Sequence, residues 1–137
     1  ADKTPFDPRL DHIGAEDILL FRQLVDAGRR FVWTPDAAIS EIIPPSRLDS
    51  SFLRRRRYLS GQHRCLVPLL LTPPRRAEVA AHMLKGAAAV AVAGPVALIG
   101  RAFGRWPVRA TGLLMSGLGK VFWWRVGAVR LYGTGHR

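Results

Sequence analysis

Apolar and polar residues follow a helical period near the start of the chain. Between Ile18 and Val25, apolar residues recur every three or four positions, which is the spacing of one helical face. Gly28 follows them as a stop signal. The pattern predicts a helix that begins near Gly14 and ends at Gly28.

The period changes to two after this helix. Phe31 and Trp33 lie two positions apart, so we expect a strand over residues 30–34. Pro35 begins a turn, and residues 37–42 are expected to form a second extended segment. The first third of the chain should therefore hold one helix and two short strands.

Ser46 and Asp49 open the next predicted helix. Their spacing resembles a capping box, with Asp in place of the usual Glu. The helix is expected to run from about Arg47 to Ser60 and to end at Gly61.

Longer apolar stretches dominate the second half. Residues 86–100 carry no charge, and residues 110–119 form a second apolar stretch. Both are shorter than the ~20 residues that a spanning helix needs. We interpret residues 77–132 as helices that lie in, or dip into, a membrane surface; a re-entrant or thin spanning hairpin is the alternative. Four aromatic residues are placed like interfacial anchors: Trp106, Trp123, Trp124 and Tyr132.

Charge is distributed unevenly over the 137 residues. Residues 1–49 hold nine acids and six bases, whereas residues 50–137 hold fifteen bases and a single acid, Glu78, within a total net charge of +11. Such a basic segment favours a polyanionic partner. Because the bases punctuate apolar stretches and no nucleic-acid-binding motif occurs, an anionic membrane is favoured over a nucleic acid.

The single cysteine, Cys65, cannot form an internal disulfide, which fits a reducing cytoplasmic environment. We interpret it as a small apolar filler. The chain begins at Ala1 without a signal sequence, so we expect either a processed protein or a fragment. The predicted location is the cytoplasmic face of the cell membrane, either peripheral or with a short inserted segment.

The run from Phe6 to Glu41 has a recognisable order: a loop ending in Gly and a small residue, Glu-Asp opening a helix, a Gly-terminated end, a strand and a Pro-Asp-Ala turn. Over residues 5–61 it resembles the segment of family 2 glycosyltransferases that follows their metal-binding motif. The resemblance implies an α/β parent fold (GT-A, Rossmann-like) represented only by its C-terminal part. This chain would then be mostly α-helical with two short strands.

The resemblance also implies site residues. Asp17 would be the general base that deprotonates the acceptor hydroxyl in an inverting transfer, and Glu16 would contact the acceptor. His12, just before this pair, is a further acceptor-binding candidate. The alternative is structural: two acids in a first turn complement the helix dipole, and a loop histidine is ordinary polar surface.

A second group of candidates lies in the arginine-rich helix. Arg54, Arg57 and Tyr58 form R-x-x-R-Y, which resembles the Gln-x-x-Arg-Trp motif of processive relatives, with Gln and Trp replaced. The departure favours a non-processive enzyme. These residues would bind the nucleotide diphosphate as it leaves, since guanidinium groups suit phosphate geometry. The alternative is a set of phospholipid-facing or solvated arginines.

Two parts of such an enzyme are missing from the sequence: no Asp-x-Asp metal motif and no Gly-rich phosphate loop occur. The parent enzyme would use a divalent metal, Mg²⁺ or Mn²⁺, whose main ligands this chain lacks, and we assign no metal ligand here. We expect the nucleotide-binding half to lie upstream, and the chain alone not to transfer sugar.

The sequence therefore divides into two predicted parts. Residues 1–65 would be the acceptor and catalytic-base part of a glycosyltransferase that moves a sugar from a nucleotide donor to a glycan or lipid-linked acceptor. Residues 66–137 would be basic amphipathic membrane-associated helices. The alternative function is a membrane-surface binding protein without catalysis, and a nucleic-acid-binding fragment is the least favoured.

Overall fold

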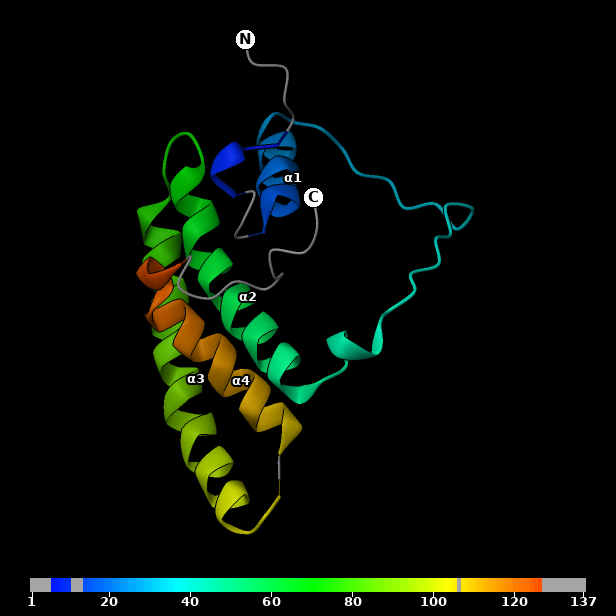
Figure 1. Ribbon diagram of the computed structural model, residues 1–137. Coiled ribbons are helices and arrows are strands. Elements are labelled where there is room, and N and C mark those ends of the chain that lie inside the picture. Colours follow the sequence, from blue (N-terminus) through cyan, green and yellow to red (C-terminus); the bar gives the residue numbers. More distant parts are fainter. Residues whose placement is uncertain (1–5, 11–13, 106, 127–137) are drawn as a thin grey trace.

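Four α-helices make up most of the computed structural model, which describes residues 6–10, 14–105 and 107–126 (Figure 1). They are α1 (Glu16–Asp26), α2 (Ser50–Leu70), α3 (Arg76–Ala102) and α4 (Val108–Val121). Short 3-10 turns accompany them at Pro8–Leu10, Pro45–Arg47 and Trp123–Arg125. α2, α3 and α4 pack together, and α1 lies against one end of α2.

The expectation of an α/β fold with two short strands is wrong, because no strand occurs in the part of the chain that the structure describes. Residues 27–46 are all exposed: Phe31 contacts the ring of Phe21 in α1 edge-on, and the rest of the segment extends away from the helices (Figure 1). A strand exists only as a member of a hydrogen-bonded ladder, and none forms here. The spacing of Phe31 and Trp33 supplies the right pattern without a neighbouring strand to pair with.

Local signals set the ends of α1. Gly14 and Ala15 both adopt left-handed backbone conformations, with φ of 79° and 78°, and turn the chain into the helix at Glu16. Gly28, with φ of 75°, follows the last turn. α1 is held by a small apolar cluster: Leu10, Ala15, Leu19, Val67 and Leu71.

α2 is longer than the sequence predicts. Its N-cap is Asp49, whose carboxylate accepts hydrogen bonds from the backbone N–H groups of Ser51 and Phe52. The Ser51 hydroxyl also donates a hydrogen bond to this carboxylate. That bond is the largest cause of a pKa of Asp49 below its usual value, and the backbone N–H groups add to it. The predicted end at Gly61 is wrong, since the helix continues to Leu70.

Gly61 serves packing and not termination. A Cβ at Gly61 would overlap the carbonyl oxygen of Ser116, and one at Gly119 would overlap the carbonyl oxygen of Tyr58. The α2 and α4 backbones therefore touch where only glycine fits. α3 and α4 meet in the same way, since a Cβ at Gly86 would lie 2.9 Å from the carbonyl oxygen of Gly117. Small residues at contacts of this kind are typical of helices that associate in membranes.

Opposite faces of α3 have different surroundings. Val79, Gly86 and Ala93 are buried and recur every seven residues on the face towards α4. At 3.6 residues per turn, the large exposed apolar residues lie between about a quarter and half a turn around the helix from this line. We call them the outer face of α3: Leu84, Val92, Val96, Leu98 and Ile99, with Phe103 directly after the helix.

Candidate functional site

Asp17 and Glu16 occupy the first turn of α1, where partial positive charge favours carboxylates. The Asp17 side chain is exposed, and its Oδ1 accepts a hydrogen bond from the N–H of Ile18 at 2.8 Å. Glu16 is half-buried, and its Oε2 is enclosed without a hydrogen-bond partner. Asp17 can therefore meet a ligand from solvent. His12 lies outside the described residues.

Arg54 and Tyr58 share an open hollow on the amino-terminal part of α2. They are four residues apart and so lie on one helical face. Ser51 and Arg55 of α2 and Met115 of α4 complete the lining of this hollow, whose volume is about 410 Å³. Arg54 is oriented by its own helix, since its Nη1 donates to the Ser50 hydroxyl at 3.2 Å. The exposed lining of this hollow is mostly apolar, so a phosphate group would be bound by the guanidinium groups at its edge and not by the hollow itself.

Arg57 does not line this hollow. Its side chain extends over α4, where its Nε would lie 3.8 Å from a Cβ at Gly112. The three predicted diphosphate-binding residues are therefore divided between two places. Arg54 and Tyr58 form one group, and Arg57 lies beside the middle of α4.

The two halves of the predicted site lie at different levels of α2. The start of α1 is beside His63, whose Cε1 would lie 3.7 Å from a Cβ at Gly14. Arg54 precedes His63 by nine residues, which at 1.5 Å per residue is roughly 14 Å along the helix. No residue of α1 lines the hollow of Arg54 and Tyr58. Asp17 and these two residues are not brought into one pocket.

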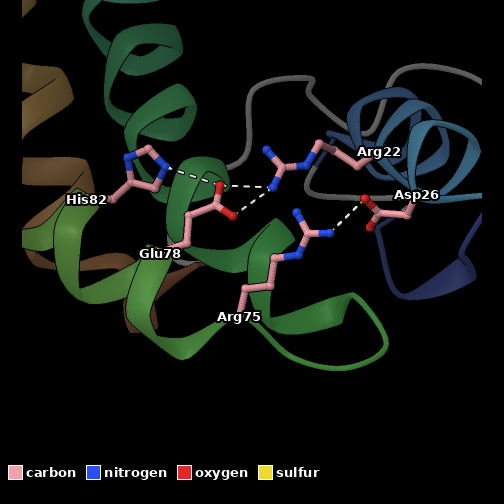
Figure 2. A network of polar contacts seen from close by, with 5 residues as sticks. All are labelled: Arg22, Asp26, Arg75, Glu78 and His82. Atoms are coloured by element: carbon pink, nitrogen blue, oxygen red, sulfur yellow. Dashed lines mark hydrogen bonds and ion pairs between the residues drawn. The ribbon is translucent and has the colours of Figure 1, made fainter. Parts of the chain in front are cut away.

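An ionic network joins α1 to the start of α3 (Figure 2). Nη2 of Arg22 donates to both carboxylate oxygens of Glu78, at 2.9 and 2.7 Å. Arg75, just before α3, bonds Asp26 at 2.6 Å. The Arg22 guanidinium is the main reason why the pKa of Glu78 lies below its usual value. These contacts set the orientation of α1, and with it the direction in which Asp17 points.

His82 lies beside Glu78, with Nε2 3.6 Å from Oε1 (Figure 2). Burial lowers the pKa of His82, against the raising effect of the Glu78 carboxylate. The imidazole is therefore neutral at pH 7. No role for His82 was predicted from the sequence, and the side chain lies at the edge of the network.

The α2–α4 contact encloses polar groups of limited reactivity. Gln62 is fully buried, and its Nε2 donates to the carbonyl oxygen of Phe122 at 3.2 Å. The Cys65 thiol donates to the carbonyl oxygen of Lys120 at 3.5 Å. Burial raises the pKa of Cys65 to about 11. Such a thiol is not a nucleophile at neutral pH, which fits its interpretation as a filler.

The residues described by the structure contain no group of three or more His, Cys, Asp or Glu side chains that could hold a metal ion. The Mg²⁺ or Mn²⁺ that the resemblance implies therefore has no fitting ligand set in this part of the chain. We derive no chemical step through a metal.

Sequence reasoning missed three residues of the hollow. Ser51 and Arg55 precede Tyr58 by seven and three positions, so same-face spacing could have found them. Met115 comes from another helix, and no local signal connects it with α2. The contact between Arg22 and Glu78 was also missed, because it joins residues 56 positions apart.

α3 is long and apolar enough to cross a membrane by length and composition, and only 11% of its most apolar window is buried within the structure. The predicted anchors Trp123 and Trp124 follow α4, with Trp124 exposed; Trp106 and Tyr132 lie outside the described residues. Comparison of the chain with protein-family models, with curated proteins and with solved structures returned no match.

Proposed function

We propose that this chain binds a membrane surface through α3 and α4. The observation that carries the proposal is the outer face of α3, which exposes Leu84 and, over the carboxy-terminal third of a 27-residue helix, further large apolar side chains. Soluble monomers rarely expose a continuous apolar stripe of this kind, and one that is bordered by bases is typical of interfacial helices.

Basic residues border the apolar stretches at both ends. Lys85 precedes the uncharged residues 86–100, and further bases follow them around the connection to α4 and beyond the end of α4: Arg101, Arg105, Arg109 and Arg125. Each base near an anionic surface adds about 1 kcal/mol of attraction. Anionic lipids are therefore the expected partner, with the apolar outer face supplying the remaining binding energy.

Flotation with lipid vesicles tests this proposal. The chain should float with vesicles of equal parts phosphatidylcholine and phosphatidylglycerol, and less with phosphatidylcholine alone, with the difference reduced by salt. Ile99→Asp, on the outer face, should weaken binding about tenfold or more, because loss of a buried Ile removes roughly 1.5–3 kcal/mol.

Ser60→Asp is the matched control, since it adds the same charge at an exposed position of α2. It should bind nearly as well as the unchanged chain. If neither the unchanged chain nor Ser60→Asp floats with anionic vesicles, the proposal is wrong. Retention on RNA with no vesicle binding would favour the nucleic-acid alternative.

We further propose that the chain is part of an inverting, non-processive glycosyltransferase that uses a nucleotide-sugar donor and a glycan or lipid-linked acceptor. The Glu16-Asp17 pair that opens a Gly-terminated helix supports this, together with the exposed Asp17 carboxylate and the arginines that line the hollow with Tyr58. In this proposal Asp17 takes the proton of the acceptor hydroxyl, and Glu16 contacts the acceptor.

The test uses the polypeptide that joins this chain to a nucleotide-binding half. Sugar transfer from a panel of radiolabelled nucleotide sugars to membrane acceptors should fall at least about 100-fold in Asp17→Asn, the usual contribution of a general base. Asp36→Asn removes an equally exposed carboxylate from the 27–46 segment and should leave transfer unchanged. Equal activity of the two variants would refute the assignment of Asp17.

A further inference from the structure

The arginines of α2 restrict how α3 and α4 can meet a bilayer. The uncharged residues 86–100 of α3 lie against α4, with Gly86 opposite Gly117 and Gly100 opposite Pro107. α3 and α4 therefore form a hairpin in which the uncharged parts of both helices lie side by side. At 1.5 Å per residue, the uncharged part of α3 is roughly 22 Å long, which is shorter than the ~30 Å hydrocarbon core.

α2 places three arginines beside these uncharged parts. Arg57 extends over Gly112, and Arg54 and Arg55 share their hollow with Met115, so all three lie beside the uncharged residues 110–119 of α4. α2 cannot slide away from α4, because their backbones touch at Gly61 and Gly119. A hairpin standing upright in the bilayer would carry these arginines into the hydrocarbon, where charged side chains are strongly disfavoured.

The other orientation keeps the arginines of α2 out of the hydrocarbon. Most of the outer face of α3 lies a third to nearly half a turn from the buried line of Val79, Gly86 and Ala93, and that line faces the rest of the bundle. Lys85 is exposed on the outer face, seven residues before Val92, and its long side chain can reach the level of the phosphate groups. With the helix axes parallel to the membrane, the outer face can enter the acyl chains while α2 stays on the polar side. Interfacial helices bury their apolar faces ~5–10 Å deep in this way.

We infer that α2, α3 and α4 bind one leaflet of an anionic phospholipid bilayer with their axes in the membrane plane. The outer face of α3 contacts acyl chains, and the arginines of α2 remain at the level of the phosphate groups or in water. The connection between α3 and α4 stays on the side from which the protein bound. This inference rests on the proposed membrane binding and adds its geometry.

Single-cysteine variants distinguish the two orientations. In a Cys65→Ala background, Arg105→Cys reports on the connection between α3 and α4, Ser60→Cys on α2, and Ile99→Cys on the outer face. Each protein is added to sealed vesicles of equal parts phosphatidylcholine and phosphatidylglycerol, and the vesicles are purified by flotation. A membrane-impermeant maleimide is applied to the outside of the vesicles, and labelling is compared before and after the vesicles are opened with detergent. In a second measurement, a nitroxide attached at position 99 is tested for collision with oxygen and with a water-soluble nickel chelate.

The in-plane orientation predicts full labelling of positions 105 and 60 without detergent, and a nitroxide at position 99 that meets oxygen more often than nickel. Bound protein whose position 105 is labelled only after detergent would overturn the inference and leave membrane binding intact. A nitroxide at position 99 that meets nickel as freely as one at position 60 would also overturn it, because the outer face would then be in water. Failure of the unmodified chain to float is the separate outcome that removes the proposed function itself.

Discussion

α1 is attached to the molecule through a few side chains, whereas α2, α3 and α4 touch backbone to backbone. The contacts of α1 are one small apolar cluster around Leu19 and two ion pairs, Arg22–Glu78 and Asp26–Arg75. The three longer helices meet at glycines where no side chain fits. The bundle should therefore behave as one unit, and α1 should detach without unfolding it.

Among the changes that test these contacts between helices, Gly61→Ala should have the largest effect, because the new Cβ overlaps the carbonyl oxygen of Ser116, and backbone cannot move aside as a flexible side chain can. Overpacking of this kind costs about 3 kcal/mol. Thermal unfolding in mild detergent, followed by far-UV circular dichroism, should show a clearly lower midpoint.

Gly112→Ala is the matched control, since its Cβ would meet only the Nε of Arg57, at an ordinary distance of 3.8 Å. The change should be neutral or slightly stabilising, because alanine favours a helix over glycine by roughly 0.5–1 kcal/mol. Equal midpoints for the two variants would mean that the bundle is not held by glycine contacts.

Leu19→Ala should release α1 and leave the bundle intact. Leu19 is 1% exposed in the cluster with Val67 and Leu71, and we expect a loss of about 2 kcal/mol, the lower end for such truncations, because a small cluster collapses easily. Amide hydrogen exchange should become about 30-fold faster in α1 and remain unchanged in α2–α4. The matched control is Val25→Ala, an exposed position of the same helix; faster exchange throughout the bundle would contradict the comparison.

These two experiments also separate what the sequence could and could not predict. The ends of α1 were predictable because first-turn acids and Gly28 act within the helix itself. The end of α2 was not, since the role of Gly61 is decided by Gly119, 58 residues later. Helical spacing likewise gives Arg54 and Tyr58 a common face, but only the bundle adds Met115 and moves Arg57 to another place.

The prediction of two strands is wrong for a related reason. Alternation at Phe31 and Trp33 describes side chains that suit a sheet, but a strand also needs a partner for its backbone groups. No such partner occurs among the residues that the structure describes. Local pattern predicts elements whose hydrogen bonds are internal, and helices alone satisfy that condition.

The ion pair between Arg22 and Glu78 should add a smaller contribution to the docking of α1. Both side chains are about one-third exposed, so a double-mutant cycle with Arg22→Ala and Glu78→Gln should give a coupling of about 0.5 kcal/mol. Exchange of α1 amides measures each variant. A coupling near zero would leave the apolar cluster and the Asp26–Arg75 pair as the attachments of α1.

The same network predicts weaker docking of α1 in acid. The pKa of Glu78 is lowered in the folded chain, with the Arg22 side chain of α1 as the largest cause, so Glu78 favours docking of α1 above its ordinary pKa of 4.5. As the pH falls below 4.5 this contribution is lost. In Glu78→Gln this acid step should disappear from the exchange rate of α1, and its persistence would assign it to another carboxylate.

Trp33→Ser should have the smallest effect, because Trp33 is 84% exposed on a segment that makes no strand. We expect a change in the free energy of unfolding within ±0.5 kcal/mol, the usual range for surface positions. Phe52→Ala, at a 7% exposed position of α2, is the contrasting variant and should lose several kcal/mol, about 3–5 for such residues. A loss above about 1 kcal/mol in Trp33→Ser would show that residues 27–46 pack against the helices in solution. The contrast between a tightly joined bundle and a loosely held amino-terminal region would then not hold at Trp33, where we expect the contrast to be greatest.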